Sequence, residues 1–279
     1  MISEERLLAF INTQSQQIKG WFYPADMLSF FFLDLIQKQV SVTGSLCEVG
    51  VYEGKSLVLL SLMQREGERL LGFDLFPDDS LPNTRANLSQ YGSTRAVELH
   101  AGDTSGLSLD GLRGLMPEGL RLLHIDAGHE YHEVLHQLTL FAPFVRNGGV
   151  IIMDDYQDRE FPGIEAAVLD FCERDRPRRF VPFFAGANKM YLCERHWAGV
   201  YQRFLLGMEA VRDKSRVTRV RDFTILVGFS KLPVPAQACL AAIDRLEFPL
   251  PYDTDEQALA AHAARFDQFT FGAGKPRSA

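Results

Sequence analysis

Five short apolar runs recur between residues 45 and 156, and longer segments with helical spacing separate them. Each run ends at or near a glycine or an acidic residue, and runs of this length and character predict buried strands. The runs are residues 45–49, 69–73, 97–100, 122–126 and 150–156, the last with its acidic residues at the tip. Strands that alternate with helices predict an α/β fold with a parallel, doubly wound sheet.

The region before the first run has helical patterns only. Residues 3–18 begin with acidic residues and carry apolar residues at helical spacing, which predicts an amphipathic helix. Residues 24–40 predict a second helix, because a proline suits its first position and apolar residues occupy more than one side. We expect residues 1–44 to form a helical cap with the aromatic residues 30–32 in the core. The alternative, in which these rings and residues 21–23 line a substrate pocket, stays open.

The region after the fifth run completes the sheet and then continues without a recognisable motif. Residues 162–171 predict a helix, and residues 180–184 and 189–193 predict a closing pair of strands. We therefore expect a core over residues 45–195 and a C-terminal extension over residues 196–279, acting as a lid or a subunit contact or adding a strand to an edge. Its expected elements are helices at 197–208 and 235–246 and a strand at 223–228.

A glycine turn connects the first strand to its helix. Gly50 and Gly54 allow the backbone to turn tightly, and the residues from Lys55 onward have the apolar character of a packed helix. A carboxylate or phosphate could approach the free amides of this helix start, while Glu48 could bind a cationic group. The spacing matches neither the dinucleotide fingerprint nor the phosphate loop, which argues against NAD and ATP.

The motif Glu48-Val-Gly50-Val-Tyr52-Glu-Gly54-Lys-Ser56 resembles the first motif of class I S-adenosylmethionine-dependent methyltransferases, in the form seen in catechol-type O-methyltransferases. The resemblance covers roughly residues 20–194. It implies a Rossmann-like, seven-stranded methyltransferase fold whose last strand is antiparallel. It also implies S-adenosylmethionine as the cofactor, which the motif residues Glu48, Gly50, Tyr52, Gly54 and Ser56 would bind.

The same resemblance assigns roles to acidic residues at later strand ends. Asp74 follows the second strand and would bind the ribose, since one carboxylate can accept both vicinal hydroxyls. Asp103, in the sequence Gly-Asp-Thr, would accept from the adenine amine, and Asp126 would complete the cofactor set. A cap or a turn is the alternative role of Asp74 and Asp103.

Asp126, Asp154 and Asp155 lie at neighbouring strand ends and would offer the oxygen ligands that Mg²⁺ prefers. This arrangement resembles the macrocin-type and catechol-type metal-dependent O-methyltransferases, in which such aspartates hold the metal. His129 falls where catechol enzymes have a lysine base, so the resemblance implies catalysis by His129 and Asp126 on a hydroxyl of a sugar or a small natural product of secondary metabolism. A metal-independent methyltransferase acting on oxygen or nitrogen is the alternative.

A second, unrelated motif lies in the segment 131–141. His132-Glu133-Val-Leu-His136 matches His-Glu-x-x-His, in which two histidines bind zinc and the glutamate activates water. A zinc hydrolase is therefore an alternative function. The flanking strands of a parallel sheet and the missing Gly-x-x-His continuation favour an exposed helix face instead.

Composition narrows the class of protein further. The 279 residues, 46% of them apolar, can bury a full core, and the net charge of −7 without basic clusters excludes a footprint for nucleic acid or an anionic membrane. No apolar run approaches the roughly 18 residues of a membrane span. We expect a cytoplasmic homo-oligomer that binds a small hydroxylated substrate. The scattered cysteines Cys47, Cys172, Cys193 and Cys239 predict buried free thiols rather than disulfides.

Overall fold

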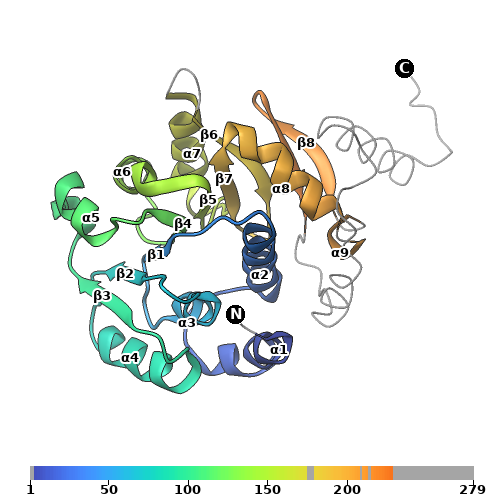
Figure 1. Cartoon of the computed structure of the whole chain (residues 1–279). Coiled ribbons are helices and arrows are strands. Elements are labelled where there is room, and N and C mark those ends of the chain that lie inside the picture. Colours follow the sequence, from blue (N-terminus) through green and yellow to red (C-terminus); the bar gives the residue numbers. More distant parts are fainter. Residues whose placement is uncertain (1–2, 175–178, 208, 213–214, 229–279) are drawn as a thin grey trace, which may run out of the picture.

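The computed structural model describes residues 3–174, 179–207, 209–212 and 215–228. Within this part of the chain, one sheet of nine strands has the order β3-β2-β1-β4-β5-β7-β6-β9-β8 (Figure 1). The strands are β1 (Ser45–Val49), β2 (Leu70–Asp74), β3 (Val97–Ala101), β4 (Leu120–Ile125), β5 (Val145–Met153), β6 (Phe180–Ala185), β7 (Met190–Glu194), β8 (Arg216–Val220) and β9 (Phe223–Val227).

The first seven strands confirm the fold class that the sequence predicts. β3, β2, β1, β4 and β5 are parallel, and β7 runs antiparallel to both β5 and β6. A parallel pair needs a crossover connection, so each of these parallel strands leads into a helix that returns the chain to the same end of the sheet. The carboxyl ends of the five parallel strands consequently meet at one edge.

Helices cover both faces of the sheet. They are α1 (Glu4–Asn12), η1 (Gln14–Gln17), α2 (Pro24–Gln39), α3 (Lys55–Met63), α4 (Ser80–Tyr91), η2 (Thr104–Gly106), α5 (Leu109–Leu115), α6 (Tyr131–Phe141), η3 (Ala142–Phe144), α7 (Pro162–Arg174), α8 (Arg195–Gly207) and α9 (Glu209–Arg212). None of the helices in the described ranges combines the length and the apolar character that a membrane span requires.

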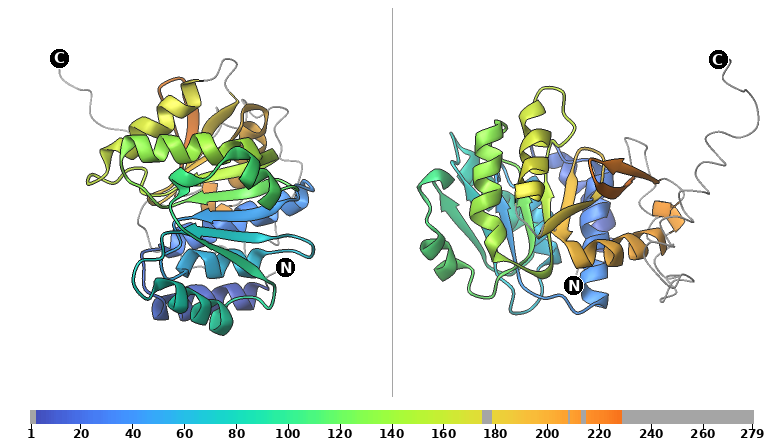
Figure 2. Two further views of the ribbon diagram at one scale, coloured as in Figure 1. Left: turned by 90° about the vertical axis from the view of Figure 1, so that its left-hand side faces the viewer. Right: turned by 90° about the horizontal axis from the view of Figure 1, so that it is seen from above.

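The sheet separates two hydrophobic clusters, one on each of its faces. On one face, the side chains of α5, α6 and α7 pack on the sheet through residues such as Leu112, Val134 and Val168. On the other, α1, α2, α3 and α8 contribute residues such as Phe10, Leu59 and Phe204. The views in Figure 2 show α6 and α7 side by side on their face of the sheet. Alternate residues of each strand face alternate clusters, as the pleat requires.

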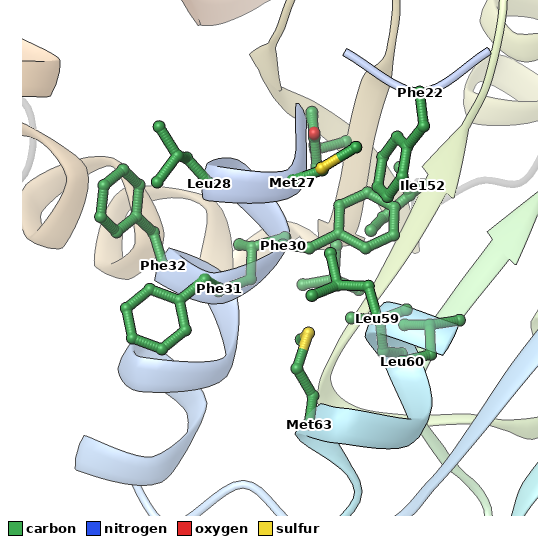
Figure 3. Close-up of a cluster of buried hydrophobic side chains, with 14 of the residues drawn as sticks. Phe22, Met27, Leu28, Phe30, Phe31, Phe32, Leu59, Leu60, Met63 and Ile152 are labelled. Atoms are coloured by element: carbon green, nitrogen blue, oxygen red, sulfur yellow. The ribbon is translucent and has the colours of Figure 1, made fainter. Parts of the chain in front are cut away.

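Helix α2 carries the aromatic residues whose role the sequence left open. Phe30, Phe31 and Phe32 are all buried, so their predicted place in the core is confirmed. Figure 3 shows Phe30 turned toward Phe22 and Phe31 and Phe32 on the other side of α2. The rings of Phe22 and Phe30 meet edge to face at 5.1 Å, a favourable geometry for aromatic pairs.

The C-terminal extension lengthens the sheet beyond the seven strands that the resemblance implies. The strand predicted at residues 223–228 is β9, which pairs in parallel with β6 and antiparallel with β8. The helix predicted at 197–208 corresponds to α8. The helix predicted at 235–246, Cys239 and the remainder of the chain from residue 229 lie outside the described residues. Cys47, Cys172 and Cys193 are free thiols and buried, as predicted.

A buried ion-pair network holds the opposite end of the sheet. The guanidinium of Arg121 on β4 is fully buried and donates to both carboxylate oxygens of Glu68, at 2.7 and 2.9 Å, and to Gln37 Oε1 at 2.9 Å. It also lies 2.9 Å from Asp34 Oδ1, which accepts from Arg65 on the same oxygen at 2.8 Å. Two cations thus balance two carboxylates and connect α2 to β4.

Removing this buried guanidinium should destabilise the fold strongly. We expect Arg121→Met to lower the free energy of unfolding by about 3–5 kcal/mol, because Glu68 loses its guanidinium partner and Asp34 is left with Arg65 alone. Urea denaturation measures this loss. The matched control is Arg113→Met, whose exposed pair with Asp110 should contribute less than about 1 kcal/mol. Equal, small losses in the two variants would contradict the stabilising role of the network.

Candidate active site

The parallel strands bring the predicted acidic residues to one edge of the sheet. The register pairs Glu48 with His124, and the amide of Asp126 continues the ladder by donating to Val49 O at 2.7 Å. The amide of Asp154 does the same to Ile125 O at 3.0 Å. Side chains from β1, β4 and β5 therefore converge at their carboxyl ends, which is where open α/β sheets bind ligands.

The glycine turn passes so close to β4 that only glycine fits. Gly50 has a φ of +88°, and a Cβ there would lie 1.8 Å from the carbonyl oxygen of Asp126. Gly54, with a φ of +82°, is the N-cap of α3, and Ser56 lies in the first turn of this helix. The backbone amides at this helix start make the kind of surface that accepts an anionic group.

Asp74 organises this turn from the end of β2. Its Oδ2 accepts from the amides of Val51 and Tyr52 at 2.6 and 2.8 Å, and its Oδ1 accepts from the amide of Phe76 at 2.5 Å. Each carboxylate oxygen has two acceptor sites, so Oδ2 is filled and Oδ1 keeps one. Asp74 can thus accept from a single further hydroxyl while it fixes the conformation of the glycine turn.

Asp103 lies on the exposed rim of the site. It is the N-cap of η2, and its Oδ1 accepts from the amide of Ser105 at 2.8 Å. That hydrogen bond holds the pKa of the Asp103 carboxyl below its ordinary value. Its remaining acceptor sites can accept from a ligand amine.

A row of buried charges crosses the sheet behind this edge. His124 Nδ1 lies 2.7 Å from Glu48 Oε1, and its Nε2 lies 3.2 Å from Asp154 Oδ2. The ammonium of Lys189, on the turn before β7, contacts the same Asp154 oxygen. Glu48 Oε2 is buried without a hydrogen-bond partner in the described part of the chain. Such an orphaned carboxylate oxygen calls for a further donor, which a ligand could supply.

The protonation of this row follows from its pairing. Burial alone would lower the pKa of His124, but hydrogen bonds to Asp154 and Glu48 raise it to about 9. Burial would raise the pKa of Asp154, but Lys189 and His124 lower it below the ordinary value. Two cations therefore face the carboxylates of Glu48 and Asp154. For Asp126, burial and the charge of Asp154 outweigh the opposing charges of His124 and Lys189 and raise its pKa well above the ordinary value.

His129 and Asp155 form a second, more exposed pair. His129 Nε2 lies 3.2 Å from Asp155 Oδ2, and the imidazole stacks on Phe161 with ring centroids 4.1 Å apart. Asn188 donates to Asp155 Oδ1 at 3.1 Å. With one ring nitrogen hydrogen-bonded to the carboxylate, the other is available as a proton acceptor. The arrangement can orient a base at the mouth of the site.

The predicted metal ligands divide between these two arrangements. Possible ligand atoms lie within 4.8 Å of one another in the group His124, Asp126 and Asp154 and in the group Asp126, His129 and Asp155. Asp126 is common to both groups, whereas Asp154 and Asp155 fall in different ones. Asp154 already accepts from a buried lysine and a histidine. The predicted set of Asp126, Asp154 and Asp155 is therefore a poor fit for a divalent ion, and its role as a metal site stays a prediction.

The His-Glu-x-x-His motif lies on the exposed face of α6. His132 and His136 are exposed. Glu133 forms a capping box with Glu130, in which the carboxylate of Glu133 accepts from the Glu130 amide at 3.1 Å. No third ligand atom joins the two histidines within 4.8 Å among the described residues. The motif therefore has a structural use at the start of the helix.

Sequence reasoning missed His124, Lys189 and Asp26. Asp26 on α2 is fully buried, and its Oδ1 accepts from the amide of Ala187 at 3.3 Å. A signal for His124 exists, because it is a polar residue inside an apolar strand and shares a face with Asp126 two positions later. Lys189 and Asp26 have no comparable signal, since only the antiparallel return of β7 and the packing of α2 bring them to this edge.

The segment before α2 lies across the glycine turn. Lys55 donates to the carbonyl of Gly20, and Lys19 pairs with Glu53 at 3.1 Å. Phe22 turns inward, with its ring 5.3 Å from Lys189 Nζ, whereas Trp21 is 90% exposed. This segment supplies the apolar wall of the buried charge row and the outer surface beside the turn.

Comparison with known proteins agrees with this geometry. Residues 47–156 match the model of a methyltransferase domain family. The matched segment runs from β1 to the loop after β5 and contains the glycine turn, Asp74, Asp103, Asp126 and the pair at 154–155. The order of the parallel strands in this part of the sheet, β3-β2-β1-β4-β5, agrees with this match.

Other similarities are more distant. An uncharacterized protein of Acanthamoeba polyphaga mimivirus is 28% identical over 142 residues, which are 49% of this chain and 62% of that protein. Thus less than two thirds of that relative is matched. A TDP-rhamnose O-methyltransferase of calicheamicin biosynthesis is 20% identical with a TM-score of 0.48, over 60% of this chain and 78% of that chain. An O-methyltransferase from Bacillus cereus in complex with SAH is 17% identical with a TM-score of 0.48, over 69% and 91%.

The buried Asp26 should give the stability a specific pH dependence. Burial raises the pKa of Asp26 to about 6 from 3.8, although Lys189 and His124 oppose the shift and Asp154 adds to it. Between these values the folded state binds more protons than the unfolded state, so stability falls as the pH rises through this window.

Asp26→Asn removes this titration. Relative to the unchanged protein, the free energy of unfolding of the variant should therefore increase by up to roughly 3 kcal/mol between pH 4 and pH 7. Denaturant unfolding at both values measures the difference, with the exposed Asp110→Asn as the control. A difference for Asp26→Asn that does not change with pH would contradict the raised pKa.

Proposed function

We propose that this protein transfers the methyl group of S-adenosylmethionine to a hydroxyl of a small molecule, such as a sugar or another natural product. The observation that carries this proposal is the orphaned, fully buried Oε2 of Glu48 at the end of β1, two residues before the close turn at Gly50. A cofactor that carries an ammonium group would satisfy this oxygen. The methyltransferase match over residues 47–156 supports the same assignment.

The proposed cofactor contacts follow the strand ends. Glu48 would bind the ammonium, and the backbone around Gly50, Tyr52, Gly54 and Ser56 would receive the carboxylate near the start of α3. Asp74 would accept from one ribose hydroxyl through the remaining site on Oδ1. Asp103 would accept from the adenine amine, and Asp126 would border the methionine end.

The methyl acceptor needs alignment and the removal of a proton. Displacement at a sulfonium methyl requires an in-line oxygen, and a positioned base lowers the barrier further. We assign the base to His129, because Asp155 holds one of its ring nitrogens and Phe161 fixes the plane of the ring. This pair favours a hydroxyl acceptor, whose proton must be removed, over an amine.

Mg²⁺ takes no part in these steps. The set predicted to hold it, Asp126, Asp154 and Asp155, fits the ion poorly because Asp154 is paired with Lys189 and His124. The group Asp126, His129 and Asp155 would hold an ion only at the expense of the proposed base. We therefore favour the metal-independent form of the reaction over the Mg²⁺-assisted form.

Cofactor binding is the first test of the proposal. Titration of S-adenosylhomocysteine into the protein, followed by calorimetry, should show saturable binding. Asp103→Ala should weaken it by about tenfold or more, because it removes a charge-assisted hydrogen bond. Asp110→Ala, another exposed aspartate, is the matched control and should bind normally. Absence of binding to the unchanged protein would contradict the proposed function.

The role of His129 requires a separate test. We expect His129→Gln to lower kcat for methyl transfer by about 10²–10⁴-fold and to leave the affinity for S-adenosylhomocysteine nearly unchanged. A screen of hydroxylated acceptors supplies the assay. His136→Gln on the exposed face of α6 is the control, and it should change neither quantity. Loss of activity in His136→Gln would instead favour chemistry at the His-Glu-x-x-His motif.

A further inference from the structure

The carboxylate of Asp154 is almost saturated with donors from the protein itself. Its Oδ2 accepts from His124 Nε2 at 3.2 Å and from the ammonium of Lys189, and its Oδ1 accepts from the amide of Asp155 at 2.8 Å. A carboxylate has about four acceptor sites, and three of them are used by these groups. The one site that is left lies on Oδ1, so a divalent ion that bound Asp154 there would share the carboxylate with the buried ammonium of Lys189.

Contacts with neighbouring groups fix the side chain of Lys189 in position. The residue is only 2% exposed, and its backbone carbonyl accepts from the amide of Gly186 at 2.9 Å. The ring of Phe22 covers the ammonium on one side, and Asn188 Oδ1 lies 3.4 Å from it. The lysine therefore cannot move into solvent without opening the contact between the segment before α2 and the turn before β7.

We infer that Lys189 is the resident cation of this site and occupies the place of the divalent ion, so that the protein binds no divalent metal there. A metal ion beside Asp154 would lie next to a buried ammonium and a histidine that also faces Glu48, and like charges repel strongly where water is excluded. The ammonium of Lys189 already supplies a positive charge beside Asp154, and the two ring nitrogens of His124 face Glu48 and Asp154, so neither is free to bind a metal ion.

Lys189 also acts as a positioning residue for the proposed base. Asp154 receives the amide of Asp155, whose backbone has a φ of +52°, a conformation that L-residues adopt rarely. Asp155 in turn contacts His129. By holding Asp154, Lys189 fixes the backbone that orients the base. This catalytic consequence rests on the proposed function, whereas the absence of metal binding can be tested without any activity.

The test measures Mn²⁺ binding to the full chain after treatment with EDTA, by electron paramagnetic resonance and calorimetry. The unchanged protein should bind no stoichiometric Mn²⁺ at millimolar concentrations, and its affinity for S-adenosylhomocysteine should be the same with EDTA and with Mg²⁺. Lys189→Met should create a site for a single Mn²⁺, and Mn²⁺ should raise the melting temperature of this variant alone. Lys38→Met, an exposed lysine on α2, is the control and should bind none.

Further variants decide between the outcomes. Asp154→Asn in the Lys189→Met background should abolish the new Mn²⁺ site. Stoichiometric Mn²⁺ binding to the unchanged protein that is lost in Asp154→Asn would overturn the inference, and so would a folded Lys189→Met that gains no site. If Lys189→Met does not fold, the measurement on the unchanged protein decides. Failure to bind S-adenosylhomocysteine would contradict the proposed function and leave the Mn²⁺ result unaffected, so the two failures are distinguishable.

Discussion

The contact between Lys189 and Asp154 is the interaction on which the active edge of the sheet depends. Burying a charge costs much free energy unless an opposite charge lies beside it. Here the ammonium neutralises the carboxylate, and Asp154 in turn bonds to His124, which faces Glu48. Four ionisable groups can therefore be buried together at this edge of the sheet.

At the opposite end of the sheet, an arginine instead of a lysine neutralises the buried carboxylates. Arg121 binds Glu68 with two nitrogens and reaches Gln37 and Asp34 as well. The planar guanidinium suits such a fixed set of partners, whereas the compact ammonium of Lys189 suits one crowded carboxylate. Both networks attach α2 to the sheet, through Asp34 at one end and through Asp26 near Lys189 at the other.

The sequence predicted the parallel core well because each strand is a short apolar run and each ends in a recognisable turn. Glycine spacing and acidic residues at strand ends also placed Glu48, Asp74, Asp103 and Asp126 at one edge. Lys189 could not be placed in this way, since its position depends on how β7 returns beside β5. Of the two added strands, β9 was predicted from its apolar run at residues 223–228, whereas β8 was not, because two of its five residues are arginines and it forms no apolar run.

The exposed Trp21 has a practical consequence for spectroscopy. The chain has two tryptophans, and the indole of Trp197 donates to Asn147 and lies close to Tyr201. Trp21 is surrounded by water beside the glycine turn, so its emission should be red-shifted and easily quenched by iodide. Any molecule that covers the turn would change this signal. The fluorescence of Trp21 can therefore report on ligand binding at the glycine turn.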